Sequence, residues 1–230
     1  MVGTIGDKMY IYLIGGLILM AVWVALYLLR KDLRKELLVV SFLLTPLGIT
    51  EIFFVPRYWQ PVTLFGWIPG IESFLFSFAV GGIAAVLYEF LLDRRLRKMR
   101  EAEQVTHRHM IYLIIAIVVS IILFSFFFGK NYIYTMIVSG FIGAVVIMFL
   151  RRDLIKKSII GGIFFFVFYF LFTLLINFLF PGFFYRVWNL ENLIGIFLWD
   201  VPLEELLWAF ATGMLVAPIY EYLRAYRVTD

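Results

Sequence analysis

Cysteine is missing from the 230 residues of the chain, and only two histidines are present. Without cysteine the chain can form no disulfide, no thiolate metal site and no redox-active thiol pair. The two histidines, His107 and His109, fall in a strongly charged stretch that is typical of a solvated loop. A glycine-rich nucleotide fingerprint is also missing, because the glycines lie within apolar runs or in isolated turns. We therefore expect no cofactor and no metal ion.

Charged residues are scarce as well, at 16% of the chain, while 63% of the residues are hydrophobic and 20% are aromatic. A soluble domain of this length would carry more charge on its surface. The charges are clustered, and the apolar runs between the clusters are about 19–23 residues long, enough for a helix to cross the ~30 Å hydrocarbon core. The sequence predicts an all-α integral membrane protein with seven transmembrane helices, at Met9–Leu29, Leu37–Val55, Ile71–Leu92, Met110–Phe128, Tyr132–Leu150, Ser158–Phe180 and Leu203–Leu223.

The basic residues predict how these helices are oriented. Sixteen of the twenty Lys and Arg residues fall in the segments 30–36, 93–109, 151–157 and the tail after Tyr222. Because cytoplasmic loops carry the excess of basic residues, we expect a multi-pass cell-membrane protein with its N-terminus outside and its C-terminus in the cytoplasm. This clustering also accounts for the net charge of +4 without a nucleic-acid patch, so no nucleic-acid partner is expected. The first apolar run leads straight into basic residues, which favours an anchor over a cleaved signal.

The chain contains an internal duplication. Residues 67–91 align with residues 199–223 without a gap, and ten of the twenty-five aligned pairs are identical. The basic turn at 30–35 likewise matches the turn at 151–156. Since a single helix connects the two units, they should be parallel repeats related by an axis along the membrane normal. The predicted organisation is a first three-helix repeat at 1–105, a connecting transmembrane helix at 106–130 and a second three-helix repeat at 131–230.

Acidic residues crowd the start of the last helix, where Asp200, Glu204 and Glu205 occur within six residues. A charge inside a bilayer costs several kcal/mol, so this crowding suggests proton chemistry. Glu72 opens the third helix, and Glu51 lies near the C-terminal end of the second helix, where the helix dipole disfavours an anion. Close carboxylates in a low dielectric cannot all ionise, which leaves a protonated acid beside a carboxylate. We predict that Glu51, Glu72, Glu204 and Glu205 are catalytic.

A second group of residues is expected at the same end of the helices, to bind substrate or to stabilise a cation. Trp208 lies on the helix face of Glu204 and Glu205, and an aromatic face attracts a cation. Arg57 is placed to hold a neighbouring carboxylate ionised, whereas Trp188 fits the interfacial aromatic belt. The predicted members are Arg57, Tyr58, Trp59, Trp67, Asn177, Trp199 and Trp208.

Structural alternatives exist for the acids. Those at the start of the last helix could serve as helix caps, because acids favour a helix N-terminus and Pro202 suits a first turn. Glu89 and Glu221, at the other ends of the third and last helices, are expected to be solvated helix ends, and the basic runs are expected to be solvated anchors.

The segment Trp199–Glu205, with the pattern Trp-x-x-Pro-x-Glu-Glu, resembles the membrane-integral lycopene cyclases, in the form that fuses two small subunits. Glu51, the segment Pro56–Pro61 (Pro-Arg-Tyr-Trp-x-Pro) and the three-helix duplication add to the resemblance. The first repeat keeps only Pro69-Gly-Ile-Glu72-Ser73, so the two halves are not expected to be equivalent. The resemblance implies an isomerase without a cofactor: a linear ψ end of lycopene is protonated, a ring closes through a carbocation, and a proton is lost. The substrate would be lycopene dissolved in membrane lipid.

Other functions remain open from the sequence. A carotenoid 1,2-hydratase of similar build would protonate the same double bond but let water capture the cation. A small-solute transporter would need polar residues at the bilayer midplane, where this chain has Phe, Ile, Val and Leu. A retinal photoreceptor would need a lysine in the last helix, which has none. The sequence also leaves a homo-oligomer open.

The distribution of basic residues makes the orientation testable. Reporter fusions at Asp230 and within the loop Asp93–His109 should both give a cytoplasmic signal, because both positions adjoin basic clusters. An external signal from either fusion would contradict the predicted orientation.

Overall fold

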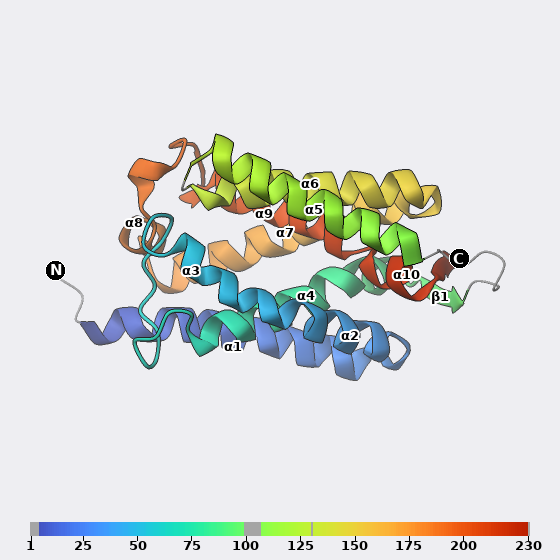
Figure 1. Cartoon of the computed structure of the whole chain (residues 1–230). Helices are drawn as coiled ribbons and strands as arrows, with labels where there is room; N and C mark the ends of the chain where they lie inside the picture. Colours follow the sequence, from blue (N-terminus) through green and yellow to red (C-terminus); the bar gives the residue numbers. More distant parts are fainter. Residues whose placement is uncertain (1–4, 99–106, 130, 230) are drawn as a thin grey trace.

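The computed structural model describes residues 5–98, 107–129 and 131–229, and it is a bundle of long helices that lie side by side (Figure 1). Connections 55–70 and 180–202 meet at one end of the bundle, called the loop end below. The other end carries the turns after α1 and α6 and most of the Lys and Arg residues, and is called the basic end. The all-α expectation is confirmed for the described residues, since the strands are only two to four residues long.

The first half of the chain supplies α1, α2, α3 and α4. Their bounds, with the intervening 3-10 segments and the first strand, are α1 Ile5–Leu29, η1 Lys31–Leu33, α2 Arg34–Leu44, η2 Thr45–Thr50, α3 Glu51–Phe54, α4 Ile71–Leu92 and β1 Arg95–Lys98. The helix expected at Leu37–Val55 is therefore interrupted at η2, where Pro46 lacks the N–H that an α-helix would use. Gly48 lies here against α4, and a Cβ at this position would come within 2.8 Å of the Phe74 backbone.

The second half continues with α5, which covers one side of the bundle, and then repeats a similar course. The remaining bounds are α5 His107–Phe127, α6 Tyr132–Leu150, η4 Arg152–Leu154, α7 Ile155–Leu179, α8 Phe183–Val187, η5 Leu190–Asn192, β2 Phe197–Leu198, β3 Val201–Pro202, α9 Leu203–Val216, α10 Ile219–Arg224 and β4 Tyr226–Thr229. The last expected helix is present, but it divides into α9 and α10 around Pro218.

Six helical segments of the described residues are long and apolar enough to cross a membrane, at 11–29, 31–54, 71–92, 132–150, 152–179 and 203–224. A shorter apolar helix, Ile111–Phe127, lies where a further spanning helix was expected. Many of its large apolar side chains are exposed on the bundle surface, Phe126 at 93% among them. In water such a surface would be unfavourable, whereas lipid tails solvate it. These features indicate a membrane protein.

The centre of the bundle is formed by α4, α7 and α9, with α1 and α2 packed on one side and α6 on the other. Small residues allow close approach where α7 meets α9. A Cβ at Gly213 would lie 2.9 Å from the Gly162 Cα, and a Cβ at Gly161 would lie 2.5 Å from the Ala217 Cβ. The aromatic core between α4 and α9 includes Phe76 and Trp208, whose rings stack 5.9 Å apart.

An arginine closes the turn after α1. Arg30 donates from Nε and Nη2 to the Asp32 carboxylate, at 3.0 and 2.9 Å, and also contacts Asp93 at 3.1 Å. It donates further to the carbonyl oxygens of Glu89 (3.2 Å) and Arg94 (2.9 Å) at the end of α4. The side chain thereby ties α1 to α4 at the basic end.

Arg151 makes the corresponding contacts after α6. It donates to the Asp153 carboxylate from Nε and Nη2, at 2.8 and 2.7 Å, and to the carbonyl oxygens of Glu221 (3.3 Å) and Tyr226 (2.9 Å). The aligned basic turns at 30–35 and 151–156 are therefore built in the same way. In each, a guanidinium binds a carboxylate, a carbonyl in the last turns of a helix and a carbonyl just beyond that helix.

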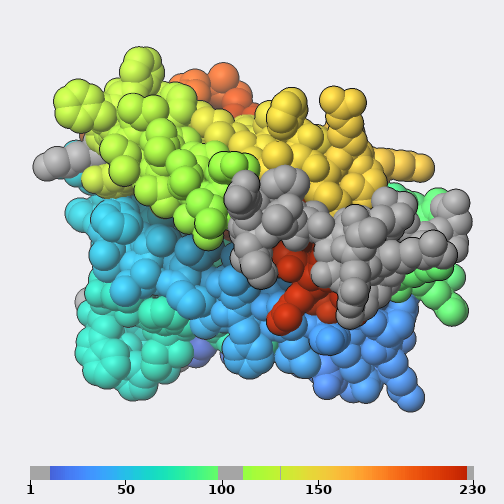
Figure 2. All heavy atoms as spheres, turned by 45° about the vertical axis from the view of Figure 1, so that its right-hand side comes forward, coloured from blue at the N-terminus to red at the C-terminus, as the bar shows by residue number. Residues whose placement is uncertain are grey.

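Strands β1 and β4 pair antiparallel at the basic end, with Arg95 opposite Thr229 and Lys98 opposite Tyr226. They follow α4 and α10, so this small sheet joins the ends of the third and last expected helices. Figure 2 shows this end of the molecule, where part of the C-terminal segment (red) reaches the surface beside α2 (blue). The residues 99–106 that follow β1 lie outside the described part of the chain.

Candidate active site at the loop end

Glu205 is the most densely hydrogen-bonded of the predicted acids. It lies in the first turn of α9 and is 5% exposed. Oε1 accepts a hydrogen bond from the Tyr58 hydroxyl and one from Trp188 Nε1 (3.0 Å), and Oε2 accepts one from the Tyr169 hydroxyl (2.7 Å). Indole N–H is a donor only, so Glu205 Oε1 must be an acceptor at that contact.

Aromatic rings adjoin this carboxylate on the side of α7 and α4. Tyr169 packs edge-on against Trp208 at 5.3 Å, and Trp208 stacks on Phe76. Tyr169 is also edge-on to Phe76 at 6.4 Å. The three rings form an electron-rich wall within the membrane-spanning part of the bundle, beside an acid that neutral donors hold in place.

Glu204 points to a different set of partners and is fully buried. Its Oε1 accepts hydrogen bonds from the Tyr134 hydroxyl and from the backbone N–H of Ile194, both at 2.7 Å. Its Oε2 is buried and has no hydrogen-bond partner among the described residues. One oxygen therefore anchors the loop before α9, and the other is available.

Glu72 has the same arrangement in the first half of the chain. It is 1% exposed, its Oε1 accepts from the backbone N–H of Leu64 at 2.6 Å, and its buried Oε2 has no partner in the described part of the chain. Glu51 is nearby: its Oε2 accepts from the backbone N–H of Gly70 at 2.8 Å. Next to Glu72 in α4, the Ser73 hydroxyl is 2.9 Å from that of Tyr12 on α1.

The two groups of acids are connected by aromatic side chains. The Tyr12 ring packs edge-on against Trp59 at 4.8 Å, and Trp59 contacts Trp188 at 5.4 Å. Trp188 in turn donates to Glu205. A short β-bridge between Trp59 and Trp188 fixes the connections 55–70 and 180–202 to each other. The loop end is thus a continuous polar and aromatic layer that includes all four predicted catalytic glutamates.

Capping does not explain the acids of α9. The N-cap residue is Pro202, and no side chain makes a cap hydrogen bond there. Both carboxylates of the helix, from Glu204 and Glu205, are instead directed to tyrosines of other segments. Asp200 differs from them, because it is exposed and accepts from the Tyr185 hydroxyl at 3.0 Å. Asp200 therefore lies outside the buried group.

The structure separates the predicted substrate-binding residues into two sets. Tyr58, Trp59 and Trp208 belong to the buried layer described above. Trp67 and Trp199 are exposed, at 63% and 71%. The Trp67 ring packs tilted against Phe65, and the Trp199 ring stacks on Phe170. These two tryptophans lie at the loop surface instead of facing the acids.

Arg57 and Asn177 are also apart from the carboxylates. Arg57 is exposed, and no ion pair joins it to a glutamate within the described residues, so its expected role in holding a site carboxylate ionised stays a prediction. Asn177 lies on α7 with its side-chain oxygen buried and without a hydrogen-bond partner in the part of the chain that is described.

Sequence reasoning missed four residues of the layer: Tyr12, Tyr134, Tyr169 and Trp188. The first three lie inside apolar runs, where a tyrosine at helical spacing is indistinguishable from a core residue. Trp188 was assigned to the interfacial belt, but it is only partly exposed and donates to a buried carboxylate. A buried tyrosine or tryptophan needs a hydrogen-bond acceptor for its O–H or N–H group. This requirement could have indicated that these residues pair with the buried glutamates.

Tyr58 is held in its protonated form. Its burial, together with the charge of Glu205 and the hydrogen bond to that carboxylate, raises the pKa of Tyr58 well above its usual value. A phenol that stays neutral across the physiological pH range remains a hydrogen-bond donor to Glu205.

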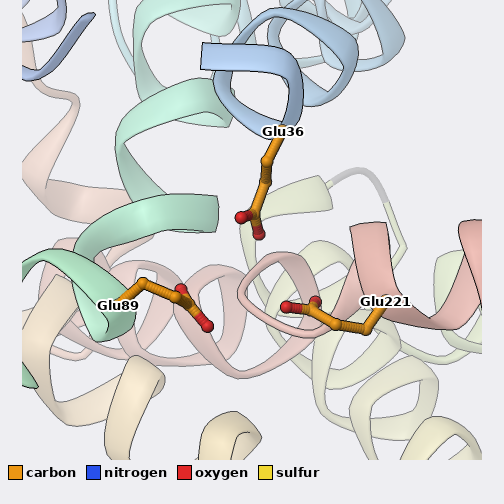
Figure 3. A group of neighbouring side chains, drawn as sticks. All are labelled: Glu36, Glu89 and Glu221. Carbon is orange, nitrogen blue, oxygen red and sulfur yellow. The ribbon is translucent and has the colours of Figure 1, made fainter. Parts of the chain in front are cut away.

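At the basic end, the expectation for Glu89 and Glu221 is wrong. Both are fully buried, and their carboxylates contact the ammonium group of Lys157, itself 2% exposed instead of a solvated anchor. Figure 3 shows Glu89 and Glu221 pointing toward each other and toward Glu36. Glu89 and Glu221 lie at the ends of apolar runs, and this position alone does not predict that a lysine from another helix contacts them.

Removal of the Glu204 side chain should loosen the loop before α9. In Glu204→Ala the Ile194 N–H and the Tyr134 hydroxyl lose their acceptor, so chymotrypsin should cut within residues 189–200 faster than in the unmodified protein. The rate is measured by limited proteolysis of detergent-purified protein. Glu191→Ala, an exposed glutamate of the same loop, is the matched control and should leave the rate unchanged. Equal rates in both variants would contradict the anchoring role.

Comparison with known proteins agrees with the resemblance seen in the sequence. Residues 131–223 match the family model described as lycopene cyclase. Neither the curated proteins nor the solved structures give a match. The matched segment contains Tyr134, Tyr169, Trp188 and both glutamates of α9, so the second half of the chain is similar to the lycopene cyclase family.

Proposed function

We propose that the protein catalyses the redox-neutral cyclisation of a linear ψ end group of lycopene. The observation that carries the proposal is Glu205, a buried carboxylate held by three neutral donors beside an aromatic wall, in the segment that matches the lycopene cyclase family. The substrate is a hydrocarbon dissolved in the bilayer, so it reaches the site laterally between helices.

The reaction needs one proton added and one removed. A proton adds to the terminal double bond and leaves a tertiary carbocation; a second double bond attacks that cation and closes the ring; loss of a proton from the new cation then restores a double bond. Atoms and electrons balance without an oxidant, a reductant or water. The requirement is therefore an acid, a base and a dry pocket that tolerates positive charge.

Glu205 fits the role of proton acceptor and counter-ion. The hydroxyl groups of Tyr58 and Tyr169 and the indole N–H of Trp188 donate to it, and they fix its position without neutralising its charge. A preorganised anion at this place stabilises a carbocation more strongly than water would, because the surroundings have a low dielectric.

Glu204 and Glu51 fit the role of proton donor. Each keeps one buried oxygen without a hydrogen-bond partner in the described residues, Oε2 of Glu204 and Oε1 of Glu51. A protonated carboxyl oriented in this way has no competing acceptor in an apolar pocket, so its proton is available to an alkene. Glu72 keeps such an oxygen as well, its Oε2, and also anchors a loop. We assign it an assisting role, because the first repeat lacks the second glutamate that follows Glu204 in α9.

The wall of Tyr169, Trp208 and Phe76 completes the proposed site. The faces of these rings carry negative quadrupolar charge, which stabilises a cation that has no hydrogen-bonding group of its own. Because the rings come from α4, α7 and α9, the reacting end of the substrate is placed at the boundary between the two halves of the chain.

The finer architecture is part of the same proposal. We infer seven spanning helices with α5 as the connector, two parallel three-helix repeats at 1–105 and 131–230, and an orientation with the loop end outside. The matching contacts of Arg30 and Arg151 support the duplication, as does the stacking of the aligned residues Phe76 and Trp208. The clustering of Lys and Arg supports the orientation.

Expression in cells that accumulate lycopene should produce a cyclic carotene of equal mass, because no step adds or removes atoms overall. The pigments are separated by chromatography and identified by mass spectrometry, and membrane insertion of the protein is verified in parallel. A product heavier by one water would assign hydratase activity instead, and unchanged lycopene would reject both.

Glu205→Gln keeps the size of the side chain and removes the exchangeable carboxyl. Cyclic product per unit of folded protein should fall at least about a hundredfold, the low end for general acid–base catalysis. Glu191→Gln, an exposed substitution of the same type, is the control and should have normal turnover. Near-normal turnover of Glu205→Gln, with its folding intact, would move the chemistry away from this carboxylate.

A further inference from the structure

A second cluster of charged side chains is buried at the basic end, far along the helices from Glu205. It consists of Glu36 from α2, Glu89 from α4, Lys157 from α7 and Glu221 from α10. Each of the four is at most 2% exposed. The cluster has no part in the proposed cyclisation, and four helices contribute to it.

Lys157 occupies one side of the cluster. Its ammonium nitrogen lies 3.1 Å from Glu36 Oε1, 2.8 Å from Glu89 Oε1 and 2.5 Å from Glu221 Oε1. Lys157 donates hydrogen bonds to Oε1 of Glu36 and of Glu221, and Glu89 contacts it as an ion pair. The three carboxylates converge on a common centre, as Figure 3 shows for the glutamates.

The second oxygen of each carboxylate is left over. Oε2 of Glu36, of Glu89 and of Glu221 is buried and has no hydrogen-bond partner among the described residues. Buried polar atoms nearly always have a hydrogen-bond partner or a ligand. Three unpaired carboxylate oxygens in one cluster therefore indicate a ligand that accepts electron pairs, such as a cation.

Charge balance leads to the same conclusion. With all three carboxylates ionised, one ammonium group would leave two negative charges in an environment that solvates charge poorly, so either protons or a cation must balance them. One divalent cation restores neutrality. One oxygen from each glutamate lies within 4.8 Å of the others, a span that a cation with metal–oxygen distances of about 2.1–2.5 Å can bridge.

A pocket of about 660 Å³ opens at the basic end, and Glu36 is part of its lining. Acids and bases both line this pocket: Asp32 and Asp93 as well as Arg30, Lys31, Lys35 and Arg95. The pocket therefore brings the aqueous side next to Glu36, which is itself 1% exposed, whereas Glu89 and Glu221 lie outside its lining.

We propose that Glu36, Glu89 and Glu221 bind one divalent cation beside Lys157. The donors are all carboxylate oxygens, which suits a hard ion such as Mg²⁺, Mn²⁺ or Ca²⁺. The ion joins α2 and α4 of the first half of the chain to α10 of the second half, next to the lysine from α7. This site is not predictable from the sequence, because its ligands are far apart in the chain and follow no spacing motif.

The test is a Mn²⁺ titration of the full chain, purified in detergent and stripped with EDTA. Free Mn²⁺ is followed by electron paramagnetic resonance, and the thermal midpoint is recorded with and without the ion. We expect saturable binding of about one ion per chain, competition by Mg²⁺ or Ca²⁺, and a higher midpoint in the presence of the ion. Neither readout depends on cyclase activity, so the outcome is independent of the proposed function.

Two variants locate the ion. Glu36→Gln at the pocket and Glu221→Gln deeper in the cluster should each raise the apparent dissociation constant for Mn²⁺ at least tenfold. The exposed control Glu191→Gln should leave it unchanged. If Glu221→Gln does not fold, the titration of the unmodified protein and of Glu36→Gln still decides. Absence of saturable binding, or binding that both cluster variants retain, would overturn the proposal and leave protons to balance the cluster.

Discussion

Burial of carboxylates in an apolar bundle is the constraint on which this structure depends. Seven glutamates of the described residues are at most 5% exposed, and each would be costly without partners. The bundle satisfies them differently at its two ends. At the loop end the partners are tyrosine hydroxyls, an indole N–H and backbone N–H groups, which are all neutral. At the basic end the central partner is an ammonium group.

The difference between neutral and charged donors distinguishes the proposed catalytic carboxylates from those that hold the helices together. Neutral donors position a carboxylate without placing a positive charge beside it, which is the arrangement that the proposed proton transfer at the loop end requires. A lysine contact cancels part of the charge and binds helices together. Two groups of acids with similar burial can therefore have unrelated roles, and the identity of the donor distinguishes them.

The backbone contacts of Glu72 and Glu204 show why the loop end is ordered. Each accepts from an amide in the connection that precedes its own helix, Leu64 and Ile194 respectively. A loop with few apolar contacts would otherwise be held weakly over the site. Each of these acids thereby ties a connection to the helix that follows it.

The apolar runs predicted the helices well where their ends carry local signals. Ile71–Leu92 and Tyr132–Leu150 have the expected bounds, because Gly70 and Asp93 flank the first and Asn131 and Arg151 flank the second. The expected helix at Leu37–Val55 is interrupted, since Pro46 and the close approach of Gly48 to α4 favour a tighter turn. The packing of Gly48 against α4 involves a segment that is distant in the chain, so the interruption of the helix cannot be predicted from the neighbouring residues alone.

The site was predictable only in part, for a related reason. The glutamates stood out because acids are rare in apolar runs, and the structure places all four at the loop end. Their donors did not stand out: Tyr169 and Tyr58 are 36 and 147 residues from Glu205, and both are ordinary in their own segments. The burial of Glu89 and Glu221 was missed because Lys157 belongs to a basic run that local sequence assigns to solvent.

The placement of Lys157 has a consequence for how the two halves recognise each other. When the basic turns at 30–35 and 151–156 are aligned, the next residues are Glu36 in the first half and Lys157 in the second. Pairing two first halves would bring four carboxylates and no ammonium group to the shared centre, because each supplies Glu36 and Glu89. The second half supplies both Lys157 and Glu221, so the cluster selects against self-association of the first half, whose acids need the lysine of the second.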